Sequence, residues 1–124
     1  MGITTNLGTS MKALFVELPA FERHRESYLT DDEFRSFQIM LLKNPLCGDV
    51  IQHTGGLRKV RFSDSKRNKG KRGGTRIIYY WHLEKSQFLL FTIYGKNIAD
   101  DLTTSQREQL SKMLDMIKKR SNDD

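Results

Sequence analysis

Hydrophobic spacing along the first third of the chain changes from a strand pattern to a helix pattern. The run KALFVE, residues 12–17, is typical of a short strand. Pro19 suits the first turn of a helix that continues to about Ser27. Thr30 and Glu33 have the spacing of a capping box, which predicts that a second helix begins there.

The second helix carries its apolar residues on one side. Phe34, Phe37 and Leu41 recur at helical spacing, with Met40 beside them. Asn44-Pro45 ends the helix, because the residue before a proline disfavours helical geometry. The residues that follow, up to position 56, show no period, so we expect a long connection there.

Three strands are predicted in the second half of the chain. Residues 57–62 alternate, with Lys59 and Arg61 on one face and apolar side chains on the other, as in a sheet with one buried side. Residues 75–82 and 88–94 are rich in β-branched and aromatic residues and are separated by a short turn. The three are expected to form an antiparallel meander.

A last helix is indicated near the C-terminus by one apolar stripe at positions 110, 113, 114 and 117. Either of two pairs could cap its start, Thr103 with Gln106 or Ser105 with Glu108. The order of strand, two helices, three strands and helix is typical of the α+β class. We therefore predict a small antiparallel sheet with two N-terminal helices and one C-terminal helix.

The 124 residues suit one domain, which we expect to cover residues 11–120. Residues 1–10 are small, polar and without a pattern, so they are expected to be a disordered leader or added segment outside the fold. Residues 121–124 are expected to be a tail.

Positive charge is concentrated in one part of the chain. The net charge is +6, and residues 58–76 hold nine basic residues and one acid, against 12 basic and 14 acidic residues elsewhere. One strongly basic hairpin on a nearly neutral body indicates binding to a phosphate polymer. The alternative is a solvated loop that keeps the protein soluble. The side chains expected to contact RNA or the ribosome are Arg58, Lys66, Arg67, Lys69, Lys71 and Arg72, most of them in a loop that should be mobile.

Composition and motifs exclude several classes of protein. No apolar run approaches the roughly 20 residues that cross a bilayer. The single cysteine, Cys47, forms no internal disulfide and is expected to pack or lie in a loop; without a secretory signal, the chain is predicted to be cytoplasmic. Motifs for metal or nucleotide hydrolysis are absent, which argues against both of these chemistries. Of the three scattered histidines, His82 is the best placed, although a structural role is favoured for it.

A cationic surface on a sheet suits the cleavage of RNA by attack of a 2′-hydroxyl on the adjacent phosphate. The transition state gathers negative charge on non-bridging oxygens, which fixed arginine or lysine donors stabilise. A lysine crowded by other cations can have its pKa lowered enough to accept a proton, whereas arginine essentially cannot. Lys59 and Arg61 share one face and Arg76 opens the next strand, so these three cations could converge.

Four segments resemble the HigB toxins of the RelE/ParE superfamily: GGLRKVRF, GKRGGTRIIYYW, FTIYGKN and DLT. The resemblance covers roughly residues 11–120. It implies a RelE-like fold and the toxin of a type II toxin–antitoxin system, a ribosome-dependent endoribonuclease that cleaves translated mRNA and so inhibits translation. It also implies that no cofactor is needed and that the partners are a HigA-like antitoxin, the ribosome and mRNA.

The family's catalytic positions fall on Lys59, Arg61, Arg76, Lys96 and Tyr94. Asn97 stands where the family has an arginine, which leaves Lys96 as the nearest cation for the phosphate. Tyr94 could stack on a base or position the scissile group, or it could only pack. The late tyrosine of RelE has no counterpart here, so the resemblance does not assign the general base.

Two other functions stay open at this point. A gyrase poison of the ParE type carries no RNA-cleaving constellation, and the clustered cations argue against it. A non-catalytic RNA-binding or ribosome-binding module would use the basic loop, residues 63–74, to hold phosphates.

Overall fold

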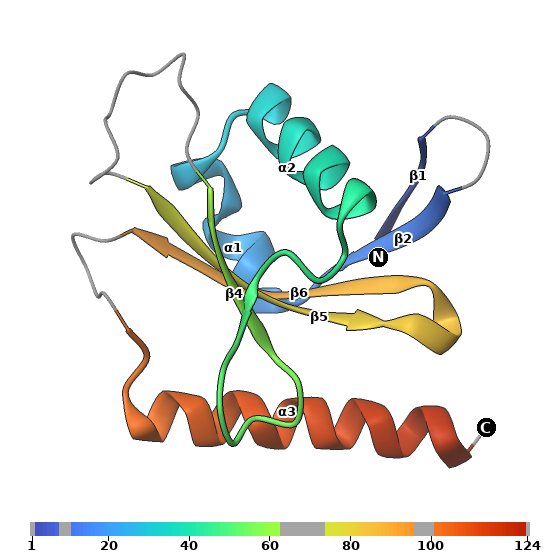
Figure 1. Ribbon diagram of the computed structural model, residues 1–124. Coiled ribbons are helices and arrows are strands. Elements are labelled where there is room, and N and C mark those ends of the chain that lie inside the picture. The colour runs from blue at the N-terminus through green and yellow to red at the C-terminus, as the bar shows by residue number, and fades with distance from the viewer. Residues whose placement is uncertain (1, 8–10, 63–73, 96–100, 124) are drawn as a thin grey trace.

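A central mixed sheet separates the helices into two layers in this computed structural model, which describes residues 2–7, 11–62, 74–95 and 101–123. Helices α1 (Pro19–Tyr28) and α2 (Asp31–Lys43) lie on one face, and α3 (Thr104–Asp123) lies on the other (Figure 1). The sheet has six strands in the order β1-β2-β6-β5-β4-β3. Their bounds are β1 Gly2–Leu7, β2 Met11–Glu17, β3 Asp49–Val50, β4 Arg58–Phe62, β5 Thr75–His82 and β6 Gln87–Gly95.

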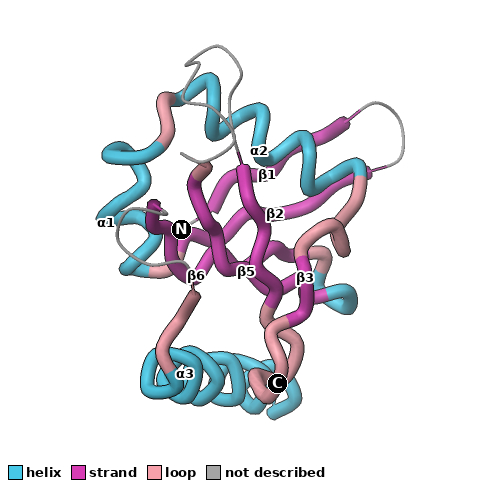
Figure 2. The backbone as a smooth tube through the Cα atoms, turned by 60° about the vertical axis from the view of Figure 1, so that its left-hand side comes forward, coloured by secondary structure: helices cyan, strands magenta, loops and turns pink. Residues whose placement is uncertain are grey.

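The α+β class and the β4-β5-β6 meander are confirmed, and the sheet is mostly antiparallel. One pair differs from the prediction, because β2 lies parallel to β6. Parallel neighbours need a long crossover connection, and here α1 and α2 form part of that connection. The turned view in Figure 2 shows α3 alone on its side of the sheet. In the part of the chain described, no helix has the length and apolar character needed to cross a membrane.

Two short strands lie where no strand was expected. Residues 2–7, expected to be a disordered leader, form β1 and pair with residues 11–16 of β2 in antiparallel register. Residues 49–50, expected to belong to a long connection, form β3 and pair with β4. Both strands lie at the edges of the sheet, where pairing depends on backbone hydrogen bonds, so the side chains need show no strong burial pattern.

Capping residues set the starts of two helices. Thr30 Oγ1 accepts a hydrogen bond from the Glu33 amide (3.1 Å), and the Glu33 carboxylate accepts one from the Thr30 amide (2.8 Å). Thr103 and Gln106 form the same reciprocal pair before α3, which decides between the two predicted caps. This last helix continues to Asp123, so residues 121–123, expected to be a tail, belong to it.

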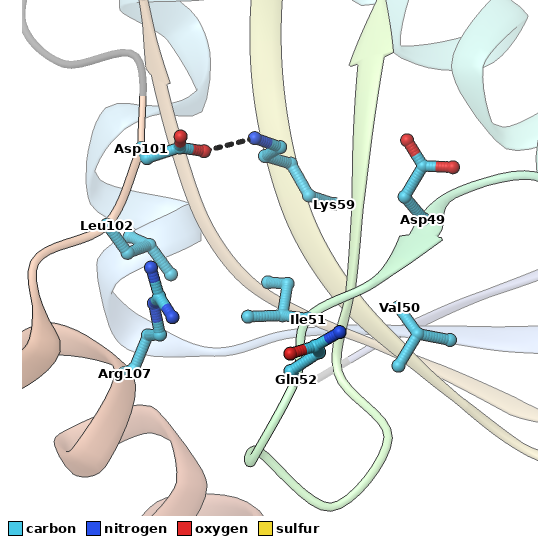
Figure 3. Close-up of a pocket in the computed structure, with 8 residues that line it drawn as sticks. All are labelled: Asp49, Val50, Ile51, Gln52, Lys59, Asp101, Leu102 and Arg107. Carbon is cyan, nitrogen blue, oxygen red and sulfur yellow. Dashed lines mark hydrogen bonds and ion pairs between the residues drawn. The ribbon is translucent and has the colours of Figure 1, made fainter.

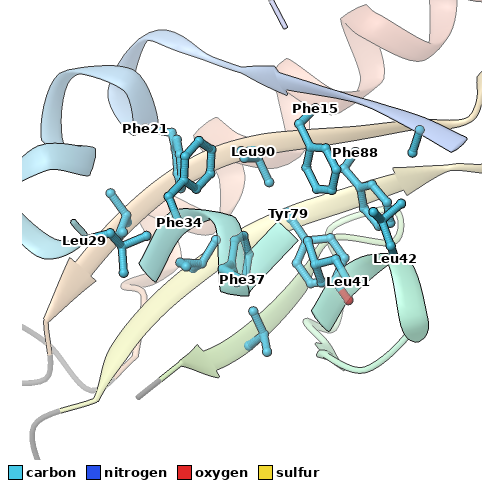
Figure 4. Close-up of a cluster of buried hydrophobic side chains, with 14 residues drawn as sticks. Phe15, Phe21, Leu29, Phe34, Phe37, Leu41, Leu42, Tyr79, Phe88 and Leu90 are labelled. Atoms are coloured by element: carbon cyan, nitrogen blue, oxygen red, sulfur yellow. The ribbon is translucent and has the colours of Figure 1, made fainter. Parts of the chain in front are cut away.

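Hydrophobic side chains cover the sheet on both faces. On the α1 and α2 side, Phe21, Phe37 and Leu41 pack with residues from β2, β4, β5 and β6 (Figure 4). On the α3 side, Leu114 packs with Leu57 and with residues from β5 and β6. The sequence predicted one buried side for 57–62, but α3 also covers the beginning of the opposite face. Lys59 and Arg61 continue that opposite face along β4.

Candidate functional site

Three of the predicted site residues form a row across β4, β5 and β6, near one end of these strands. Arg61 on β4 is directly opposite Arg76 on β5, and Arg76 is directly opposite Tyr94 on β6. Residues that face each other in neighbouring antiparallel strands point to the same side, with Cβ atoms about 4.5–5.5 Å apart. Lys59 lies two residues from Arg61 and shares its face. The structure therefore brings Lys59, Arg61, Arg76 and Tyr94 together on the α3 side of the sheet.

The members of this row differ in how much of each side chain is exposed. Arg61 is exposed, whereas Arg76 is 2% exposed and Tyr94 is 9% exposed. Arg76 Nη1 donates a hydrogen bond to the carbonyl of Gly74 (2.6 Å), which holds the guanidinium at the start of β5. The cationic surface expected from the sequence included Arg76, and the burial of this side chain corrects that part of the expectation. A phosphate can reach its guanidinium only when the groups that cover it move aside.

Lys59 is paired with an acid that no sequence motif indicated as a site residue. Its Nζ donates to Asp101 Oδ1 at 2.5 Å, and the Asp101 side chain is 70% exposed. The hydrogen bond from Lys59 lowers the pKa of the Asp101 carboxyl, and Arg107 and Arg61 add to the effect. The carboxyl is therefore ionised at neutral pH. No local pattern could reveal this contact, since the two residues are 42 positions apart.

A pocket of about 260 Å³ opens beside this ion pair (Figure 3). Three separate segments form it: β3 with the turn after it, β4, and the residues at the start of α3. Lys59 points toward Asp101 and away from Asp49, and Arg107 extends from α3 toward the same space. The lining residues are Asp49, Val50, Ile51, Gln52, Lys59, Asp101, Leu102 and Arg107.

The turn between β3 and β4 places one wall of this pocket against α3. Gly55 and Gly56 have φ values of +80° and +118°, a region that side chains with a Cβ rarely adopt. A Cβ on Gly56 would also lie 3.1 Å from the ring of Tyr80. Lys118 of α3 donates from Nζ to the Gly55 carbonyl (2.5 Å). The two glycines therefore allow the turn to pack closely against the helix and the sheet.

Arg58, expected to contact RNA, is not part of this site. It is paired with Tyr79, so its side chain leaves β4 on the α2 side of the sheet. Its Nη1 donates to the carbonyls of Gly48 (2.7 Å) and Leu46 (3.2 Å). These contacts fix the connection between α2 and β3, so the structure gives Arg58 a structural role. The other predicted contacts lie outside the described residues: Lys66, Arg67, Lys69, Lys71, Arg72 and, at the catalytic position, Lys96.

Tyr79 is a buried polar residue on the opposite face of β5. Its hydroxyl accepts a hydrogen bond from the Gly48 amide (3.0 Å) and donates one to the Pro45 carbonyl (2.8 Å). Burial raises the pKa of this phenol well above its ordinary value. Cys47 packs beside it, with Sγ 4.0 Å from the hydroxyl, which agrees with the packing role expected for the cysteine.

Two other features lie near the row without joining it. His82 is buried at the far end of β5 from Arg76, with its ring centroid 6.0 Å from that of Tyr80. Tyr94 also borders a larger, mainly apolar pocket of about 440 Å³ between α1, β6 and α3. His24 of α1 lines that pocket and His82 does not, so the structure does not bring these two histidines together.

Comparison with known protein families finds no family model that matches this sequence. Among solved structures, a double mutant of the Escherichia coli toxin RelE in its free state is similar to this chain. The likeness has a TM-score of 0.47 and 12% sequence identity, and it covers 69% of this chain and 85% of the RelE chain.

Proposed function

We propose that this protein is the toxin of a type II toxin–antitoxin system and acts as a ribosome-dependent endoribonuclease that cleaves translated mRNA. The observation that supports the proposal is the row of Arg61, Arg76 and Tyr94 across three strands, with Lys59 on the same face. Three cations on rigid strands suit a reaction whose transition state gathers charge on phosphate oxygens.

In the proposed reaction, the 2′-oxygen of the RNA attacks the adjacent phosphorus. The 2′-hydroxyl gives up its proton as the new bond to phosphorus forms. The bond to the 5′-oxygen of the next nucleotide breaks, and that oxygen takes up a proton, which leaves a cyclic phosphate and a 5′-hydroxyl. Lys59 and Arg61 hold the phosphate, and the Arg76 guanidinium stabilises the developing charge from a site where little solvent competes. Tyr94 is 9% exposed and packs in the cluster that contains Leu114, so its contribution here is to position the scissile group from within the sheet, and stacking on a base would require the groups that cover it to move. Lys96 serves the same phosphate in this proposal.

The resemblance to HigB toxins supplies the rest of the proposal. The substrate is mRNA on the ribosome in the cytoplasm, the inhibitor is a HigA-like antitoxin, and the reaction uses no metal. The basic residues 66–72 contact phosphates without reading sequence.

Purified protein added to translating ribosomes tests the function directly. We expect mRNA cut within the translated region. Stalled but intact mRNA would instead support the non-catalytic binder. Unaffected translation together with inhibited gyrase would support the ParE-type alternative.

Two substitutions test the catalytic assignment. Lys59→Ala and Arg76→Ala should each slow single-turnover cleavage by about a hundredfold or more, because each removes a fixed donor from the phosphate. Lys85→Ala, which removes an exposed cation at the far end of β5, is the control and should cleave normally.

Circular dichroism verifies that each variant is folded. Since Arg76 is buried, its loss can also destabilise the protein, and the partly exposed Lys59 then provides the cleaner measurement. Cleavage at the wild-type rate by folded Lys59→Ala would refute the assignment.

A further inference from the structure

We propose that Lys59 and Arg107 form a binding site for one phosphate of the RNA strand, and that Asp101 occupies this site in the protein without RNA. The proposal rests on the proposed function and adds Arg107 and Asp101 to it. In this arrangement the Asp101 carboxylate competes with RNA for Lys59.

The geometry of the pocket supports a site for a single anion. Lys59 comes from β4, and Arg107 is the fourth residue of α3, where the reciprocal cap of Thr103 and Gln106 fixes the helix start. Both cations line the same space of about 260 Å³, which Asp101, with a side chain 70% exposed, also lines (Figure 3). Two cations held by separate rigid elements can bind one phosphate from two directions.

The Asp101 carboxylate can occupy the position of that phosphate. It is an anion with oxygen acceptors, it contacts Lys59 Nζ directly, and Arg107 and Arg61 also attract it. Because its side chain is 70% exposed, it can leave without disturbing the core. Exposed ion pairs contribute little net stability, so a phosphate in a polymer held by further contacts can replace it.

Asp49 provides a contrast within the same pocket. It is directly opposite Lys59 in the pairing of β3 with β4, and it lines the pocket. Lys59 nevertheless points away from it and toward Asp101 (Figure 3). Substitution of either acid removes one negative charge from the pocket, but only Asp101 is the direct partner of Lys59 in Figure 3.

Binding of a 12-nucleotide oligouridine with 2′-O-methyl groups tests the proposal, because this RNA cannot be cleaved. Asp101→Asn should tighten binding by roughly two- to fivefold, the range expected when an exposed ion pair no longer competes. Asp49→Asn, the matched control, should give a smaller gain. Arg107→Ala should weaken binding.

A double substitution makes the test specific to the contact. In a Lys59→Ala background, Asp101→Asn should give no more gain than Asp49→Asn, since the cation that it competes for is gone. Two results would overturn the proposal: an equal gain in RNA affinity from Asp49→Asn in the wild-type background, or an undiminished gain from Asp101→Asn when Lys59 is absent. Either result would show that the gain is a general effect of charge.

The same measurements separate this inference from the proposed function. RNA binding by the wild-type protein that is unaffected by Asp101→Asn and Arg107→Ala would refute only the phosphate site. No binding of RNA by either the wild-type protein or Asp101→Asn would also refute the phosphate site, whereas the proposed function is decided separately by mRNA cleavage on translating ribosomes.

Discussion

Arg61 and Arg76 are directly paired across β4 and β5, yet their surroundings differ. Arg61 is exposed, while Arg76 is buried and bonded to the Gly74 carbonyl. A buried guanidinium acts in a medium of low polarity, where its attraction to a phosphate is stronger than in water. The same burial makes removal of the Arg76 side chain destabilising, because the Gly74 carbonyl would be left without this donor. We infer that Arg61 mainly binds the RNA phosphate, whereas Arg76 contributes both to the stability of the fold and to the proposed cleavage.

Tyr79→Phe should lower the free energy of unfolding by about 1–3 kcal/mol, because it leaves the buried Gly48 amide without its acceptor. Urea unfolding measures the change. Tyr80→Phe, on the opposite face of the same strand, is the matched control and should lower the free energy of unfolding by less. Equal losses in the two variants would contradict the role given to the Tyr79 hydroxyl.

The raised pKa of the Tyr79 phenol also predicts a dependence on pH. In the unfolded chain a tyrosine loses its proton near pH ~10. Since the folded state keeps the proton to higher pH, the stability due to this group is fully present below that value and is lost as pH rises above it. The stability of Tyr79→Phe should therefore fall less than that of the wild-type protein between neutral pH and the alkaline range.

At the scale of elements, the pairing of β1 with β2 changes what the first residues contribute. Six residue pairs join the two strands, from Gly2 with Val16 to Leu7 with Met11. A chain that starts at Met11 would leave one edge of β2 unpaired. We expect it to lose more than about 1 kcal/mol of stability in urea unfolding, since several backbone hydrogen bonds are removed.

Hydrogen exchange locates the effect of this truncation. Amides of β2 that face β1 should exchange faster in the shortened chain, whereas protection should persist where β2 pairs with β6, at residues 14–17. Unchanged stability together with unchanged exchange would show that β1 does not contribute to the fold in solution.

For the whole molecule, the concentration of charge predicts how binding responds to salt. Replacing Lys69, Lys71 and Arg72 with alanine should weaken RNA or ribosome binding and reduce its salt dependence. Each lost phosphate contact lowers the slope of log K against log salt by roughly 0.7–0.9. The control replaces Lys43, Lys85 and Lys112, which are exposed elsewhere and carry the same total charge. An unchanged slope in the loop variant would assign these charges to solubility alone.

Local sequence was sufficient to predict most of the elements. The capping pattern of Thr30 and Glu33 and the stop at Asn44-Pro45 act over a few residues, and the structure confirms both. The alternation in β4 is confirmed at Val60 and Arg61, whereas Leu57, just before the strand, is buried on the opposite face against α3. The edge strands β1 and β3 were missed because backbone pairing leaves little trace in side-chain pattern. The parallel pairing of β2 with β6 depends on how the whole chain crosses the sheet, which no local pattern encodes.

The sequence by itself determined that cations would share a face, because strand geometry alternates side chains with a period of two. It placed Lys59 with Arg61 and identified Arg76 as the start of the next strand. Only the tertiary structure decided that Arg76 is buried and that Lys59 meets Asp101 in a pocket with Arg107. Burial and long-range ion pairs depend on which elements pack together, and here α3 and the turn after β3 meet only when the chain is folded.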